Sequence, residues 1–226
     1  LIGVEIEPTR VTQGGRLTVE ACWEALTPVA EDYTVYVQLL GQNYTRAGER
    51  HTYPGLGRYP TSLWTPGTAF CDVYRIAVEP WVPAPERYQV LVGLYLDDSR
   101  DQLTAFDSAG QPNVPPVVGT VTVAPATLPA IAPEYPVAYT LGESVLLRGY
   151  DLSGVLQSNT PLTVTLYWQA QSVLSRDYTV FVHLFDETGV MLAQDDGPPR
   201  DGWYPTSAWE AGDVIACGTS VGVGSM

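Results

Sequence analysis

Apolar and polar residues alternate with a period of two along much of this chain, which is the spacing of half-buried β-strands. Helical periodicity is almost absent. Strands are predicted at residues 4–6, 17–23, 33–39, 69–78, 87–95, 103–106 and 117–123. Their predicted core faces carry Leu17, Val19, Ala21 and Trp23, and Tyr33, Val35, Val37 and Leu39. The pattern therefore predicts an all-β protein.

Three blocks of sequence recur at one constant spacing of 145 residues. Residues 17–23 (LTVEACW) return as 162–168 (LTVTLYW), residues 32–40 (DYTVYVQLL) as 177–185 (DYTVFVHLF), and residues 59–64 (YPTSLW) as 204–209 (YPTSAW). A constant offset indicates one structural module used twice. With roughly seven to nine strands in a module, the expected architecture is two tandem immunoglobulin-like β-sandwiches.

The two modules are predicted to be unequal. The first spans residues 1–123, a Pro/Ala-rich linker spans 124–136, and the second module spans 137–226. The counterpart of Val82 in the second copy would follow Met226, so this copy is expected to lack its C-terminal strands. Similarity between the copies also fades after Gly212.

Charge and hydropathy narrow the classes of partner. The formal net charge is −14, with 25 acidic residues against 11 basic ones, all of them scattered arginines. Binding of nucleic acid needs clustered positive charge, so we expect no nucleic-acid partner. No stretch approaches the roughly 18 consecutive apolar residues of a membrane span, so this segment is not expected to insert into a membrane.

The cysteines leave two alternatives open. Cys22 and Cys71 both fall in predicted strands of the first copy, and their counterparts are Tyr167 and Ala216. The pair is either a disulfide particular to the first copy or two buried free thiols. A glycosylation acceptor motif begins at Asn43, although a pattern this short also arises by chance.

The motif Tyr-Pro-Thr-Ser-x-Trp is the most specific local signal and has two interpretations. Its aromatic residues, with one neighbour, could form a stacking platform for sugar rings. Alternatively, it is a corner in which the Trp caps the core and a hydroxyl closes the turn, which its identity in both copies favours. The residues concerned are Tyr59, Trp64, Trp203, Tyr204 and Trp209.

The sequence contains few residues in the patterns that catalysis or metal binding requires. His51, in a predicted loop, and His183, in a predicted strand, are not repeated, and no nucleophile or zinc motif accompanies them. Acidic loops at residues 97–101, 186–187 and 195–196 suggest calcium only weakly, because no EF-hand spacing is present and solvated turns explain them. We therefore predict no enzyme activity, no metal site and no cofactor.

The order of these repeated motifs, with residues 88–95 (YQVLVGLY), resembles uncharacterised β-sandwich modules of Chloroflexota. Such modules occur outside the membrane, including in the soluble tails of polytopic glycosyltransferase-like proteins. The resemblance implies a β-sandwich fold and an extracellular or cell-surface location. It supplies no activity and no site residues.

Together these observations predict a non-enzymatic structural or adhesive surface protein. An incomplete second sandwich would expose an unpaired strand edge, and such an edge recruits another strand. The expected donor is a neighbouring subunit, through residues 1–6 or 221–226, and head-to-tail repetition would give a filament. The alternatives are a pair of carbohydrate-binding modules and the soluble tail of a membrane glycosyltransferase.

Overall fold

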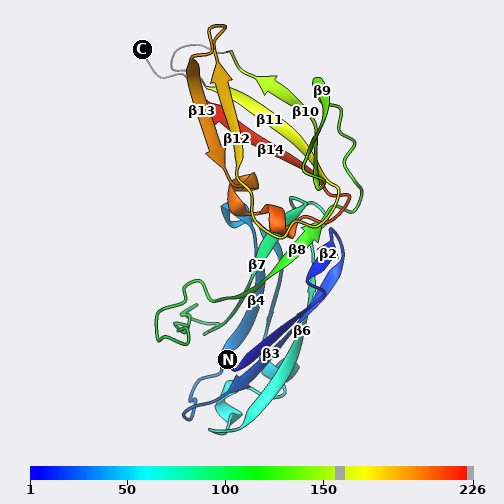
Figure 1. Cartoon of the computed structure of the whole chain (residues 1–226). Helices are drawn as coiled ribbons and strands as arrows, with labels where there is room; N and C mark the ends of the chain where they lie inside the picture. The colour runs from blue at the N-terminus through cyan, green and yellow to red at the C-terminus, as the bar shows by residue number, and fades with distance from the viewer. Residues whose placement is uncertain (156–160, 223–226) are drawn as a thin grey trace. The chain divides into compact units, whose positions relative to one another are not determined.

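The computed structural model describes residues 1–155 and 161–222, and this part of the chain is all-β, as predicted. Its helical segments are 3-10 turns of three or four residues: η1 (Gln42–Tyr44), η2 (Pro54–Gly57), η3 (Thr61–Leu63), η4 (Pro199–Gly202) and η5 (Thr206–Ala208). The chain divides into two compact units, Leu1–Ala126 and Thr127–Met226, here called unit 1 and unit 2 (Figure 1).

Unit 1 is a sandwich of two sheets, ordered β1-β3-β6 and β2-β8-β7-β4-β5. Every neighbouring pair is antiparallel except β2 and β8, which are parallel. This order is that of an immunoglobulin-like fold. The strands are β1 (Gly3–Glu7), β2 (Arg10–Thr12), β3 (Arg16–Glu24), β4 (Thr34–Leu40), β5 (Arg46–Thr52), β6 (Ala69–Ala77), β7 (Glu86–Tyr95) and β8 (Val117–Ala124).

The core of unit 1 follows the period-two pattern. The predicted inward residues of β3, from Leu17 to Trp23, are all buried, and so are Val35, Val37 and Leu39 of β4. From the other strands, β7 contributes Tyr88, whose hydroxyl donates to the carbonyl oxygen of Pro83 at 2.8 Å. A tyrosine bonded to the backbone a few residues upstream is the tyrosine corner of immunoglobulin-like sandwiches.

Unit 2 contains sheets ordered β14-β11-β10-β9 and β12-β13 in its described residues. These strands are β9 (Tyr135–Leu141), β10 (Val145–Ser153), β11 (Leu162–Ala170), β12 (Val180–Phe185), β13 (Met191–Gly197) and β14 (Val214–Val221). The core includes Trp168, Tyr204, Trp209 and Ile215.

Strand pairing recurs between the units at the offset of 145 residues. Leu17 pairs with Ile76 in unit 1, and Leu162 pairs with Val221 in unit 2. The pair β4–β5 and the pair β12–β13 also share one register, including the irregularity after Leu39 and after Leu184. Fading similarity after Gly212 therefore does not mark a change of structure, because β14 keeps the register of β6.

Several predicted boundaries were wrong. Residues 103–106 form no strand, and only Phe106 makes an isolated bridge, to Pro112. Strand β5 was missed because its sequence, RAGERHT, is mostly polar, and β2 because it has three residues. The expected linker overlaps β8 and β9, since Ala124 ends one strand and Tyr135 begins the other.

Candidate functional site

The Tyr-Pro-Thr-Ser-x-Trp motif of unit 1 closes a corner around η3. The Thr61 hydroxyl accepts a hydrogen bond from the Tyr33 N–H at 2.8 Å and donates to the carbonyl of Glu31. The indole N–H of Trp64 donates to the carbonyl of Tyr59 at 3.1 Å. These bonds tie the motif to the segment that leads into β4.

Unit 2 repeats this corner around η5. The Thr206 hydroxyl accepts from the Tyr178 N–H at 2.8 Å and donates to the carbonyl of Arg176 at 3.0 Å. The Trp209 indole donates to the carbonyl of Tyr204 at 3.0 Å. The same donors and acceptors therefore recur at the offset of 145 residues.

Burial decides between the two interpretations of the motif. Tyr204 is fully buried, and Trp64 and Trp209 keep only 8% and 2% of their surface exposed. Tyr59 and Trp203 are partly buried, and the Tyr59 ring packs edge-on against Phe70 at 5.0 Å between centroids. A sugar ring stacks on an exposed aromatic face, so the burial of Trp64, Tyr204 and Trp209 favours the structural corner over the carbohydrate platform considered above.

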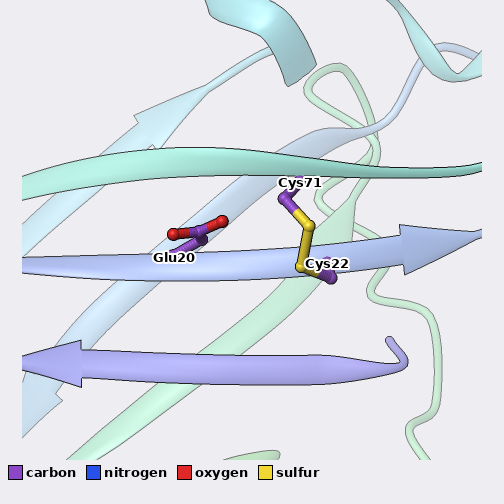
Figure 2. A group of neighbouring side chains, drawn as sticks. All are labelled: Glu20, Cys22 and Cys71. Carbon is purple, nitrogen blue, oxygen red and sulfur yellow. A yellow bond between two sulfur atoms is a disulfide. The ribbon is translucent and has the colours of Figure 1, made fainter.

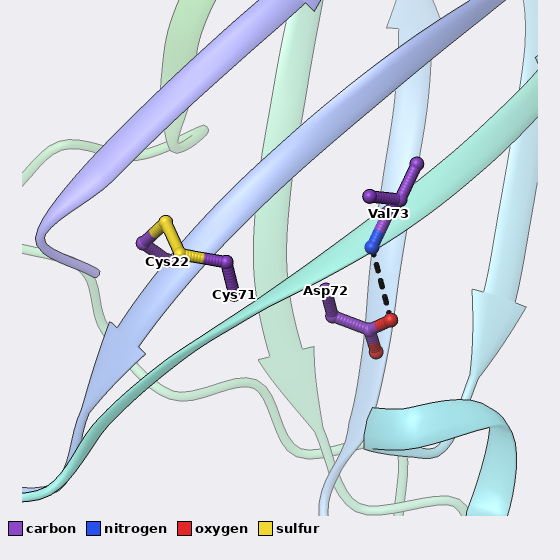
Figure 3. The surroundings of a disulfide bond; sticks show 4 residues. All are labelled: Cys22, Cys71, Asp72 and Val73. Atoms are coloured by element: carbon purple, nitrogen blue, oxygen red, sulfur yellow. Dashed lines mark hydrogen bonds between the residues drawn. A yellow bond between two sulfur atoms is a disulfide. The ribbon is translucent and has the colours of Figure 1, made fainter.

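The disulfide alternative is confirmed for Cys22 and Cys71, which are bonded in the structure (Figures 2 and 3). They are directly opposite each other on β3 and β6, with 4.0 Å between their Cα atoms, on the face of the sheet away from the core. The bond staples neighbouring strands of one sheet. Disulfides persist in oxidising compartments, so the bond is compatible with an extracellular location.

Glu20 lies beside this bond (Figure 2), and its carboxylate and the two sulfur atoms lie within 4.8 Å of one another. Both sulfurs are used in the disulfide, which leaves one carboxylate as a ligand. Asp72 follows Cys71 in the sequence, and its carboxylate accepts from the Val73 N–H at 2.9 Å (Figure 3). It also accepts from the Gly55 N–H at 2.7 Å.

The third cysteine and the glycosylation motif lie in contrasting environments. Cys217 is a buried free thiol, and burial raises its pKa to about 11, which keeps it protonated and unreactive near neutral pH. Asn43 is exposed on η1 with a φ of 53°. Its side chain is thus accessible to a modifying enzyme.

Two of the acidic loops contain carboxylates that interact with neighbouring residues of the same loop. The Asp186 carboxylate accepts from the N–H groups of Thr188 and Val190 at 2.8 and 2.9 Å, which closes the β12–β13 turn. Hydrogen bonds from Thr188 and then Val190 lower the pKa of Asp186. In the first copy, Asp97 pairs with Arg100 at 3.3 Å.

His51 belongs to β5, and not to a loop as predicted from the sequence. Its Nδ1 lies 3.1 Å from the Tyr95 hydroxyl and its ring stacks on Tyr36, so these three form a polar aromatic cluster on the outer face of the larger sheet. The sequence signal for this cluster was the outward position of Tyr36, between Val35 and Val37. His183 lies in β12, which confirms its predicted place in a strand, and its side chain is exposed.

The largest difference between the units lies at β12. Its counterpart β4 pairs with β5 on one edge and with β7 on the other. Within residues 1–155 and 161–222, β12 pairs with β13 alone, so its second edge carries no strand. Val180, Val182 and Leu184, which correspond to fully buried residues of β4, are only partly buried.

An apolar cavity of about 420 Å³ lies next to the start of β12. It is lined by Val180 and Phe181 of β12, by the core residues Trp168 and Trp209, and by Leu141 at the end of β9. Phe181 is 67% exposed, whereas its counterpart Tyr36 is 5% exposed. The core of unit 2 is therefore accessible along the unpaired edge, and this edge with its cavity is the candidate site.

Comparisons with known proteins add little. No protein-family model and no curated protein matches the sequence, so the resemblance to Chloroflexota modules stays a prediction. The crystal structure of Ruminococcus gnavus β-glucuronidase matches 91% of this chain and 30% of its own, at 11% identity and a TM-score of 0.16. The chain thus covers under a third of that protein, and so low a TM-score carries no argument.

In the described residues, no helix is long and apolar enough to cross a membrane.

Proposed function

We propose that this chain is a non-enzymatic, extracellular structural or adhesive protein, which self-associates by addition of a β-strand along the open edge of β12 in unit 2. The observation that carries the proposal is the unpaired edge of β12, beside a partly exposed apolar core. Exposed strand edges pair readily with further strands, and main-chain hydrogen bonds then supply the affinity. The disulfide of unit 1 agrees with an oxidising location.

The donor segments expected from the sequence need revision. Residues 3–7 form β1, which is already paired with β3 in unit 1. Donation of residues 1–6 would therefore require β1 to leave its own sheet, as in a domain swap. Of the other expected donor, Val221 pairs with Leu162, and residues 223–226 lie outside the described residues.

Self-association of the 226-residue chain tests the proposal. Light scattering after size exclusion should give a mass that rises above 24.5 kDa with protein concentration. Phe181→Glu should abolish the rise, because it places a further negative charge beside the open edge of an already acidic chain. Val190→Glu is the matched control, since Val190 is similarly exposed in the β12–β13 turn. A monomer at every concentration would contradict completion by a second subunit.

A further inference from the structure

Unit 2 contains a second cavity, of about 310 Å³, which is lined by residues of β13, η4 and β14. On the core side its lining is apolar and comprises Leu166, Val180 and Val182. The cavity lies on the β13 side of β12, where the two strands are paired. Each of its elements has a counterpart in unit 1 at the offset of 145 residues, so the two units can be compared here residue by residue.

The comparison points to one inward-facing position of β14. Tyr74 of β6 is opposite Val19, and Thr219 of β14 is opposite Val164, so Tyr74 and Thr219 are equivalent. Tyr74 is 2% exposed and belongs to the core of unit 1. In unit 2 the side chain at this position is a threonine, and Thr219 lines the cavity. Unit 2 therefore has open space where unit 1 holds a tyrosine ring.

The polar lining of this cavity is mainly acidic. Three carboxylates and one guanidinium line it, those of Asp195, Asp196, Asp201 and Arg200. Asp195 is opposite Val182 and so lies on the inner face of its sheet, where its Oδ2 accepts a hydrogen bond from the Thr219 hydroxyl. A carboxylate thus stands beside the residue at which the tyrosine ring of unit 1 has no equivalent.

We infer that this cavity binds a small arylalkylamine, which is an aromatic ring joined by a short chain to an ammonium group. The ring takes the space of the Tyr74 ring against Leu166 and Val182, and the ammonium group pairs with the Asp195 carboxylate. Tyramine, which is tyrosine without its carboxyl group, has both parts in this arrangement. This site goes beyond the proposed function and does not depend on strand addition at β12.

Size and chemistry agree with such a ligand. Pockets for small molecules begin at about 300 Å³, and a buried cavity of about 150 Å³ already admits benzene. Burial of the ring against apolar side chains supplies affinity. The carboxylate selects for the cation, because a charge-assisted hydrogen bond is stronger than a neutral one.

Calorimetric titration of the 226-residue chain with tyramine tests the inference. Tyrosol, which has a hydroxyl group in place of the amine, should bind at least about tenfold more weakly, and so should propylamine, which lacks the ring. Tyramine should also shift the NMR signals of residues 195–197 and 217–220. Absence of tyramine binding, or equal affinity for tyramine and propylamine, would overturn the inference, because the second result needs only attraction of a cation to an acidic chain.

The position of the ring is tested by filling the cavity from within. Thr219→Tyr restores the side chain of unit 1, so it should abolish tyramine binding and raise the melting temperature of unit 2. Thr165→Tyr is the matched control, because Thr165 is opposite Gly218 on the other face of the same sheet. It should leave the affinity for tyramine unchanged. Undiminished binding by a folded Thr219→Tyr chain would refute the site.

The position of the ammonium group is tested by removing one charge. Asp195→Asn should weaken tyramine binding about tenfold and leave tyrosol binding unchanged, since the amide oxygen can still accept from Thr219. Glu187→Gln removes the same charge from the exposed β12–β13 turn and should change neither affinity. An equal loss of tyramine binding in both variants would show that net charge, and not Asp195, attracts the amine.

Discussion

Unit 1 and unit 2 share their strand registers but differ in how well those strands are covered. Val35, Val37 and Leu39 of β4 are 0% exposed, whereas the equivalent residues of β12 are only partly buried. The sheet that contains β4 has five strands, and the one that contains β12 has two in the described residues. Register and corner geometry are thus local properties of paired segments, while the burial of β4 and β12 depends on the further strands of their own sheet.

This difference in burial predicts that the same Trp→Ala substitution destabilises the two units by different amounts. Trp23→Ala should destabilise unit 1 by about 3–5 kcal/mol, the usual cost of removing a buried large aromatic residue. Trp168→Ala should cost unit 2 less, about 1–3 kcal/mol, because Trp168 already borders a cavity. Hydrogen exchange followed through a denaturant series reports on each unit separately. Equal costs would show that the core of unit 2 is as well packed as that of unit 1.

The disulfide is a second difference between the units, because the described residues of unit 2 contain no counterpart of it. Its removal should therefore change the stability of unit 1 alone. Cys22→Ser with Cys71→Ser should destabilise unit 1 by about 2–4 kcal/mol, because the bond closes a loop with a sequence separation of 49. Unit 2 should be unaffected. Calorimetry with and without reductant gives the effect, and reductant should no longer shift the melting of the double variant.

Unit 2 offers the matching gain of a bond. Tyr167 and Ala216 are opposite each other on β11 and β14, as Cys22 and Cys71 are on β3 and β6. Tyr167→Cys with Ala216→Cys should therefore oxidise spontaneously and raise the melting temperature of unit 2. The gain is offset in part because the Tyr167 hydroxyl donates to Asp151 at 2.6 Å. Thiols that stay free to alkylation would show that the two sheets differ in geometry at this pair.

Sequence reasoning succeeded where a residue's role depends on its own strand. Alternation placed Leu17 and Val19 on the core face, and the Cys22–Cys71 disulfide was one of the two alternatives that the sequence left open. Sequence reasoning could not locate β5, because most of its residues are polar and the strand is stabilised by its pairing with β4. Alternation of apolar and polar residues could not predict the exposure of Phe181 either, because that exposure depends on which strands lie next to β12 in space.

The two corners should respond alike, in contrast to the two cores. Thr61→Val and Thr206→Val each remove a buried hydroxyl that makes two backbone hydrogen bonds. Each should cost its unit about 1–3 kcal/mol, because an N–H and a carbonyl lose their partner. Thr→Ser at the same positions keeps the hydroxyl and is the control. A cost confined to one unit would contradict the equivalence of the corners.

The smallest expected effect is the pH dependence of stability that comes from Asp32, whose carboxylate supports the corner of unit 1. Hydrogen bonds from Ser62, through its side chain and its N–H, lower the pKa of Asp32 below the ordinary value of 3.8. A lowered pKa means that the folded state favours the carboxylate, so its stabilising contribution is present above the unfolded pKa and is lost as the pH falls through the folded one. An NMR titration should find the Asp32 midpoint below that of an unfolded peptide, and Ser62→Ala should raise it. The Asp177 carboxylate accepts from the Ser207 N–H at 2.9 Å in unit 2, so Ser207→Ala compares the two corners directly. An Asp32 midpoint at its ordinary value, unmoved by Ser62→Ala, would show that these hydrogen bonds do not persist in solution.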